Sequence, residues 1–66
     1  MREYYVEQMI GDAITTWHVV RAGTPEEAAR DATGRKVRVR TAEHIWVRVT
    51  DEDLRRVYEF CFAQGQ

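Results

Sequence analysis

Residues 24–34 read TPEEAARDATG, and this stretch divides the chain into two β-rich parts. Thr24 and Glu27 have the spacing of a capping box, in which the Thr24 hydroxyl accepts from the Glu27 amide and the Glu27 carboxylate accepts from the Thr24 amide. Pro25 stands at the first helical position, and Gly34 suits the left-handed residue that follows a helix. The stretch predicts one helix of about two to three turns, which is too short to be stable unless it packs on another element.

The residues before this helix have the composition of a β-hairpin. Residues 3–10 and 13–21 are rich in aromatic and β-branched side chains. Gly11 and Asp12 separate them, and this pair suits a two-residue II′ turn because glycine takes a positive φ at its first position. We therefore predict a hairpin over residues 3–21.

Two alternating segments follow the helix. Residues 35–40 place valines on one face and basic side chains on the other, and residues 44–50 alternate in the same way with Trp46 and Arg48 facing outward. Such alternation is typical of strands with one buried face. The expected apolar side of the sheet consists of Val6, Trp17 or Val20, Val37, Val39, Ile45, Val47, Val49 and part of Phe60 and Phe62.

Residues 54–62 satisfy two patterns. Leu54, Val57, Tyr58 and Cys61 have helical spacing, whereas residues 57–62 also alternate and favour a strand. We prefer the strand because an acidic turn at residues 51–53 commonly returns as a hairpin. The predicted fold is a single α+β domain over residues 1–66, with one antiparallel sheet in the order β-β-α-β-β-β and one short helix on one face. The alternative is β-β-α-β-β-α, with a C-terminal helix.

The order of these segments resembles a group of small uncharacterised bacterial β-β-α-β-β proteins. The similarity lies in Tyr4-Tyr5-Val6-Glu7, in the helix start at residues 24–29 and in the Asp-Glu-Asp turn at residues 51–53. In that group the helix begins with Ser/Thr-Pro-Glu-Glu-Ala, and the turn continues with a glycine where this chain has Leu54. The resemblance implies a fold, and it carries no activity or site residue to this chain.

Composition argues against most catalytic and metal sites. The 66 residues include one cysteine, two histidines and no serine, so an internal disulfide is excluded and no pair has metal-site spacing. A dyad of Cys61 with His18 or His44 stays open, but nothing in the pattern supports it. We expect no enzyme, no metal and no cofactor. Since the N-terminus lacks the apolar core of a signal peptide, we expect a cytoplasmic protein that does not enter a membrane.

The charge distribution supplies a candidate surface. Seven of the ten Lys and Arg residues fall within residues 35–56, although the net charge of the chain is −1. If the two alternating strands pair, their outward side chains form one basic face around an indole, which is the type of surface that binds single-stranded nucleic acid. This candidate face consists of Lys36, Arg38, Arg40, Trp46 and Arg48. The alternative, which we prefer, is an ordinary solvated face whose charges are neutralised by acids such as Glu7 and Glu59.

A short helix cannot cover a sheet of five strands, and aromatic residues occur on both expected faces. Uncovered apolar surface is typical of protein contact sites. The sequence therefore predicts a non-enzymatic protein-interaction or self-associating module, with an unknown protein partner or a homodimer. A weak nucleic-acid-binding module is the alternative function.

Overall fold

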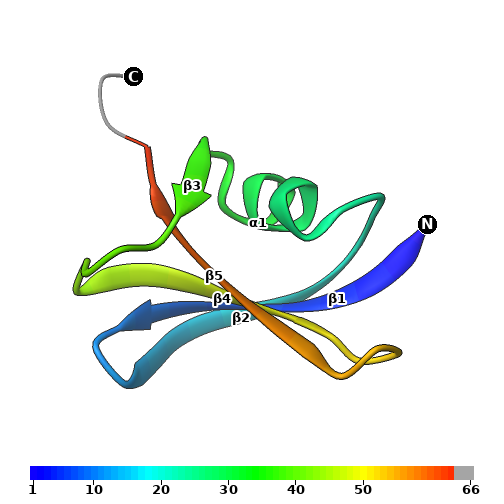
Figure 1. Ribbon diagram of the computed structural model, residues 1–66, viewed down its shortest axis with the longest axis horizontal. Helices are drawn as coiled ribbons and strands as arrows, with labels where there is room; N and C mark the ends of the chain where they lie inside the picture. The colour runs from blue at the N-terminus through cyan, green and yellow to red at the C-terminus, as the bar shows by residue number, and fades with distance from the viewer. Residues whose placement is uncertain (64–66) are drawn as a thin grey trace.

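The computed structural model describes residues 1–63, which form one antiparallel five-stranded sheet with one helix across one face (Figure 1). The elements are β1 Arg2–Ile10, β2 Ala13–Ala22, α1 Pro25–Thr33, β3 Val37–Val39, β4 Ile45–Asp51 and β5 Arg56–Phe62. This confirms the predicted order β-β-α-β-β-β, and the alternative with a C-terminal helix is wrong. The strands lie in the order β2-β1-β4-β5-β3 across the sheet.

The N-terminal hairpin forms as its turn residues predict. Ile10 pairs with Ala13 across the two-residue turn, and Gly11 takes a φ of 56°. The β1–β2 register shifts between Gln8, which faces Thr16, and Met9, which faces Ile14. Thr15 is therefore the extra residue of a β-bulge, so the side chains of β2 on either side of it change their alternation.

Both ends of α1 have the predicted caps, with one difference. The Thr24 hydroxyl accepts from the Glu27 amide at 3.1 Å, whereas the Glu27 carboxylate accepts from the Gly23 amide at 2.9 Å rather than from that of Thr24. At the other end Gly34 has a φ of 72° and donates to the Arg30 carbonyl at 2.7 Å. The boundaries of α1 are thus fixed by local hydrogen bonds.

The turn between β4 and β5 is organised by a buried aspartate. Asp51 Oδ1 accepts from the amides of Asp53 and Leu54 at 3.1 and 3.2 Å. The residue with positive φ in this turn is Arg55, at 55°. The Asp51 side chain thus supplies the hydrogen-bond acceptor for these turn amides, and the hairpin closes without a glycine.

The helix crosses from β2, at one edge of the sheet, to β3, at the other edge (Figure 1). Ala28 and Ala29 are fully buried, which lets the backbone of α1 lie close to the sheet. Of the two candidates in β2, Val20 packs against the core, whereas Trp17 points to the other face and is exposed. The core consists of Tyr4, Val6, Ala22, Ala28, Ala29, Val37, Val47, Val49 and Phe60, with Val20, Ala32, Tyr58 and Phe62 packed against it.

Two expected core positions are wrong. Val39 is 72% exposed, and Ile45 is also exposed. Ile45 faces Ile10, another exposed residue, at the far end of the sheet from the buried Tyr4 and Val6. Alternation places a side chain on a face, but α1 is too short to cover that face to its end.

A shared basic face was predicted on the condition that residues 35–40 and residues 44–50 pair with each other. The two segments do not pair. β5 lies between β3 and β4, and β3 is only three residues long. β3 pairs with the end of β5, from Val37 against Phe62 to Val39 against Phe60. Basic residues of β3 and β4 are therefore separated by a whole strand.

Candidate interaction surface

The face of the sheet opposite α1 carries the side chains that alternate with the core positions. The pairing registers place its residues in cross-strand rows. One row consists of Val19, Tyr5, Thr50 and Val57, and the next consists of Trp17, Glu7, Arg48 and Glu59. This helix-free face carries Trp17, Trp46 and Arg48, which belong to the surfaces described below.

The aromatic residue of the predicted basic face is not accessible. Trp46 lies on the helix-free face, but it is only 5% exposed, and its Nε1 donates to the Gly11 carbonyl at 2.8 Å. The guanidinium of Arg40 covers the indole, with its Cζ 4.0 Å from the ring centroid. Trp46 points away from the core as predicted, but the expectation of an accessible, stacking indole is wrong, because Arg40 from the loop before β4 folds over it.

Three of the four predicted basic residues have carboxylate partners. Arg48 Nε lies 2.7 Å from Glu7 Oε1, and this hydrogen bond raises the pKa of Arg48 above its ordinary value. Arg40 Nη1 lies 3.0 Å from Glu59 Oε1. Arg38 Nη2 lies 2.9 Å from Glu43 Oε2. These pairs, including those with Glu7 and Glu59, reduce the positive field that the basic face was expected to present.

The structure brings together only part of the predicted site. Arg40 and Trp46 are in contact, and Arg48 is two residues from Trp46 along β4. Lys36 precedes β3, where its carbonyl accepts from the Ala63 amide at 3.0 Å, and Arg38 lies within β3. The last two residues therefore belong to the far edge of the sheet, not to a single patch with Arg48.

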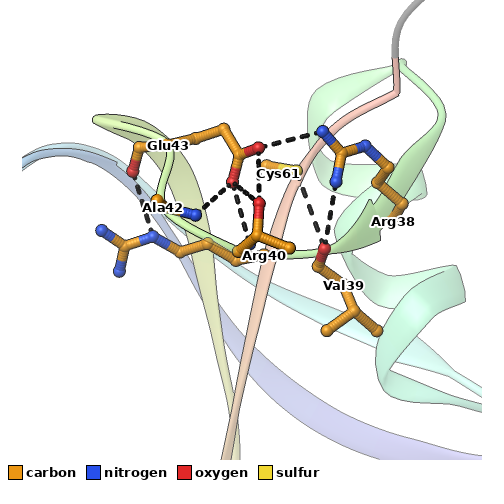
Figure 2. A network of polar contacts seen from close by, with 7 residues as sticks. Arg38, Val39, Arg40, Ala42, Glu43 and Cys61 are labelled. Atoms are coloured by element: carbon orange, nitrogen blue, oxygen red, sulfur yellow. Dashed lines mark hydrogen bonds and ion pairs between the residues drawn. The ribbon is translucent and has the colours of Figure 1, made fainter.

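Glu43 organises the segment between β3 and β4 (Figure 2). Its carboxylate accepts from the amides of Thr41 and Ala42 at 2.9 and 3.0 Å, from the Thr41 hydroxyl, and from Arg38. The backbone hydrogen bonds, led by that of Thr41, hold the pKa of Glu43 well below its ordinary value. The oxygens of this carboxylate are occupied by the loop, so Glu43 acts as a structural clamp.

Cys61 lies beneath this clamp and is fully buried (Figure 2). Its thiol faces the Val39 carbonyl at 3.8 Å, and burial raises the pKa of the thiol, which keeps it protonated. Within residues 1–63 neither histidine hydrogen-bonds to Cys61. The same residues contain no group of three or more His, Cys, Asp and Glu side chains placed to hold a metal ion. No helix in this part of the chain is long and apolar enough to span a bilayer.

An open hollow of about 730 Å³ lies beside the N-terminal end of β1. Its lining includes Arg2, Arg21, Glu3, Glu52 and Asp53, which carry charges of both signs. Arg2 is already 3.6 Å from the buried Asp51. The hollow therefore lacks a convergent set of groups for one type of ligand.

The largest group of exposed apolar side chains on the helix-free face lies on β2 instead. Trp17 and Val19 are each 57% exposed and Ile14 is 50% exposed. The Trp17 ring lies against Tyr5 of β1, with centroids 5.4 Å apart and an interplanar angle of 32°. We call Tyr5, Ile14, Trp17 and Val19 the Trp17 strip. The sequence offered Trp17 or Val20 for the core and predicted that some aromatic residues remain uncovered, but its pattern did not specify that Trp17 belongs to the exposed set.

Comparison with protein-family models, with curated proteins and with solved structures gives no match for this chain. The resemblance to small bacterial β-β-α-β-β proteins therefore stays a prediction.

Proposed function

We propose that this protein is a non-enzymatic protein-interaction module whose binding surface is the Trp17 strip. The observation that carries the proposal is the position of Trp17, which is held against Tyr5 and stays exposed on the helix-free face. Large aromatic side chains at rigid, central positions dominate the energetics of protein interfaces. A partner that contacts the strip gains this energy with little loss of side-chain entropy, because Trp17 is already ordered by its neighbour.

The other polar groups of the molecule support this proposal over catalysis or nucleic-acid binding. The Cys61 thiol is buried, and the Glu43 carboxylate accepts hydrogen bonds from the loop that contains Thr41. Arg38, Arg40 and Arg48 have carboxylate partners, so a phosphate that bound them would have to displace Glu43, Glu59 or Glu7. The Trp17 strip has no such internal partner to displace.

A photo-crosslinking experiment tests this proposal. Benzoylphenylalanine is introduced in place of Trp17, and in a matched control in place of Leu54, which is exposed in the β4–β5 turn. We expect a discrete polypeptide adduct from position 17 in the cells that natively produce the protein, none from position 54, and loss of the adduct when Val19→Lys is added. A nucleic-acid adduct at position 17, or identical products from both positions, contradicts the proposal.

A further inference from the structure

We propose that the partner of the Trp17 strip is a second copy of this chain, joined by antiparallel pairing of the outer edge of β2 with the same edge of the second copy. This inference rests on the proposed function and specifies its partner. The two-fold axis passes at Trp17, and the product is one continuous sheet of ten strands. Because such an axis is perpendicular to the sheet, both copies of α1 lie on the same face and both Trp17 strips lie on the other.

The first support is the character of the β2 edge. β2 is ten residues long and ends the sheet, so within residues 1–63 no strand pairs with its outer side. The residues of β2 from 13 to 19 are all exposed, and the strand contains no proline or lysine. Natural proteins protect long edge strands with such residues, with β-bulges or with a covering element, because an open edge pairs readily with another strand. The bulge at Thr15 lies toward one end of β2, so the edge from residue 16 to residue 22 is uninterrupted.

The opposite margin of the sheet is unsuited to pairing with β2. β3 has three residues, and basic side chains surround it and the free start of β5. These are Arg35, Lys36, Arg38, Arg55 and Arg56. Short, charged edges resist strand addition. Pairing of β2 with itself closes after two copies, whereas pairing with the opposite margin would extend without limit.

The second support is the register that self-pairing requires. Residues that face each other across a sheet project to the same side, so the two-fold axis must pass at a residue and not between two residues. The bulge at Thr15 removes one residue from the ladder, as the β1 partners show, because Thr16 faces Gln8 while Ile14 faces Met9. Counted along this ladder, Ile14 is two steps from Trp17 and Ala13, the first residue of β2, is three steps from it; Asp12 is the turn residue that comes next.

An axis at Trp17 makes the helix-free face complementary to itself. Two steps away in the other direction lies Val19, which then faces Ile14 of the second copy. Four steps away lies Arg21, which then comes opposite the turn residue Asp12 of the second copy, just beyond the end of the ladder. Both contacts occur twice by symmetry, and the two Trp17 rings meet at the centre. With Tyr5 of each copy they form a group of four aromatic rings.

The side that faces α1 is also compatible with this register. One step from the axis, His18 faces Thr16 of the second copy, and Val20 faces Ala13. An axis at His18 instead would oppose two histidines and would place Arg21 against the apolar Ile14. The match of apolar with apolar and of basic with acidic side chains therefore favours an axis at Trp17 over one at His18.

A charge exchange between Arg21 and Asp12 tests the interface. Both residues are exposed, so their substitution leaves the core intact. Light scattering and sedimentation over a concentration series are expected to show a dimer for the native chain. Arg21→Glu is expected to raise the dissociation constant at least about tenfold, and the double variant Arg21→Glu/Asp12→Arg is expected to restore it. Arg30→Glu, with the same change of charge on the surface of α1, is the matched control and leaves dimerisation unchanged.

Disulfide trapping tests the register independently. In a Cys61→Ala background, the double variant Ile14→Cys/Val19→Cys is expected to form a covalent dimer on oxidation, whereas Val19→Cys alone is not, because residue 19 does not face itself. A dimer that is insensitive to Arg21→Glu, or that crosslinks equally through Val19→Cys alone, overturns this interface. If the chain stays monomeric, the inference of a dimer is wrong. If position 17 of that monomer nevertheless forms an adduct with a different polypeptide, the proposed function still stands. A monomer without any such adduct overturns both.

Discussion

The guanidinium of Arg40 lies over the indole of Trp46, with its Cζ 4.0 Å from the ring centroid, although the two side chains come from segments separated by β5 in the sheet. The same guanidinium donates to Glu59 at 3.0 Å, and Arg40 Nε donates to the Glu43 carbonyl at 3.0 Å. Arg40 thus ties the loop before β4 to the helix-free face. Arg40 covers Trp46 on this face, as α1 covers the core residues on the other face of the sheet.

Replacement of Arg40 should therefore destabilise the fold and expose Trp46. Arg40→Met keeps an apolar stem but removes the cation–π contact and two hydrogen bonds, so we expect a loss of about 1–2 kcal/mol in the free energy of unfolding. The measurement is chemical denaturation in a Trp17→Phe background, where the emission of Trp46 is observed alone and should shift to the red. Arg30→Met on the surface of α1 is the control. Equal stability of the two variants would show that the contact with Trp46 contributes nothing.

The local elements of the fold could be predicted from the sequence because their determinants lie close together in the chain. Thr24, Pro25, Glu27 and Gly34 specify the ends of α1 through hydrogen bonds and φ values within one turn. Gly11 specifies the first hairpin in the same way. Such signals do not depend on what the element packs against.

The surface could not be predicted equally well because burial depends on contacts between distant segments. Alternation placed Trp46 on the correct face. Its burial depends on Arg40 and on the position of β5, which the pattern of β4 does not indicate. Conversely, alternation assigned Val39 to the core, although α1 does not extend far enough to cover it. The order of β3, β5 and β4 in the sheet is not encoded in the pattern of any single strand.

Loss of the helix cap should destabilise the protein modestly. Thr24→Ala together with Glu27→Ala removes the acceptors for the amides of Glu27 and Gly23, so we expect a loss of about 1–2 kcal/mol. Thermal or urea denaturation followed by circular dichroism measures it. Glu26→Ala, which removes a first-turn acid without a capping bond, should cost less, and a double variant that melts with the native chain would contradict the role of the cap.

Two valines that share the alternating pattern should respond oppositely to charge. Val47 is fully buried between α1 and the sheet, so Val47→Asp leaves an unpaired carboxylate in the core and should prevent folding. Val39→Asp, at an exposed site, should fold with nearly native stability. The amide dispersion in NMR spectra distinguishes the two results. Unfolding of the Val39→Asp variant would show that this edge of the sheet is buried in solution.

The Glu43 clamp should make stability depend on pH. The pKa of Glu43 is lowered in the folded protein, so its contribution is fully present above the ordinary value of 4.5 and is lost as the pH falls below it toward the folded value. Glu43→Gln removes this titration. We expect the native chain to be more stable than the variant at neutral pH and the difference to shrink progressively on acidification below pH 4.5, as measured by denaturation at a series of pH values. A difference that is constant over this range would contradict the clamp.

Single-stranded oligonucleotides should leave the fluorescence of Trp46 unchanged, even at low salt. A base can quench this indole only by displacing Arg40, and a phosphate can reach Arg40 or Arg48 only in competition with Glu59 or Glu7. Those acids also repel the backbone of the nucleic acid. The titration uses Trp17→Phe, so that Trp46 alone reports, and Arg38→Gln/Arg40→Gln/Arg48→Gln in the same background serves as the comparison. Quenching that weakens steeply with added salt and disappears in the glutamine variant would instead establish the basic face as a nucleic-acid site, because release of counterions from neutralised phosphates produces that salt dependence.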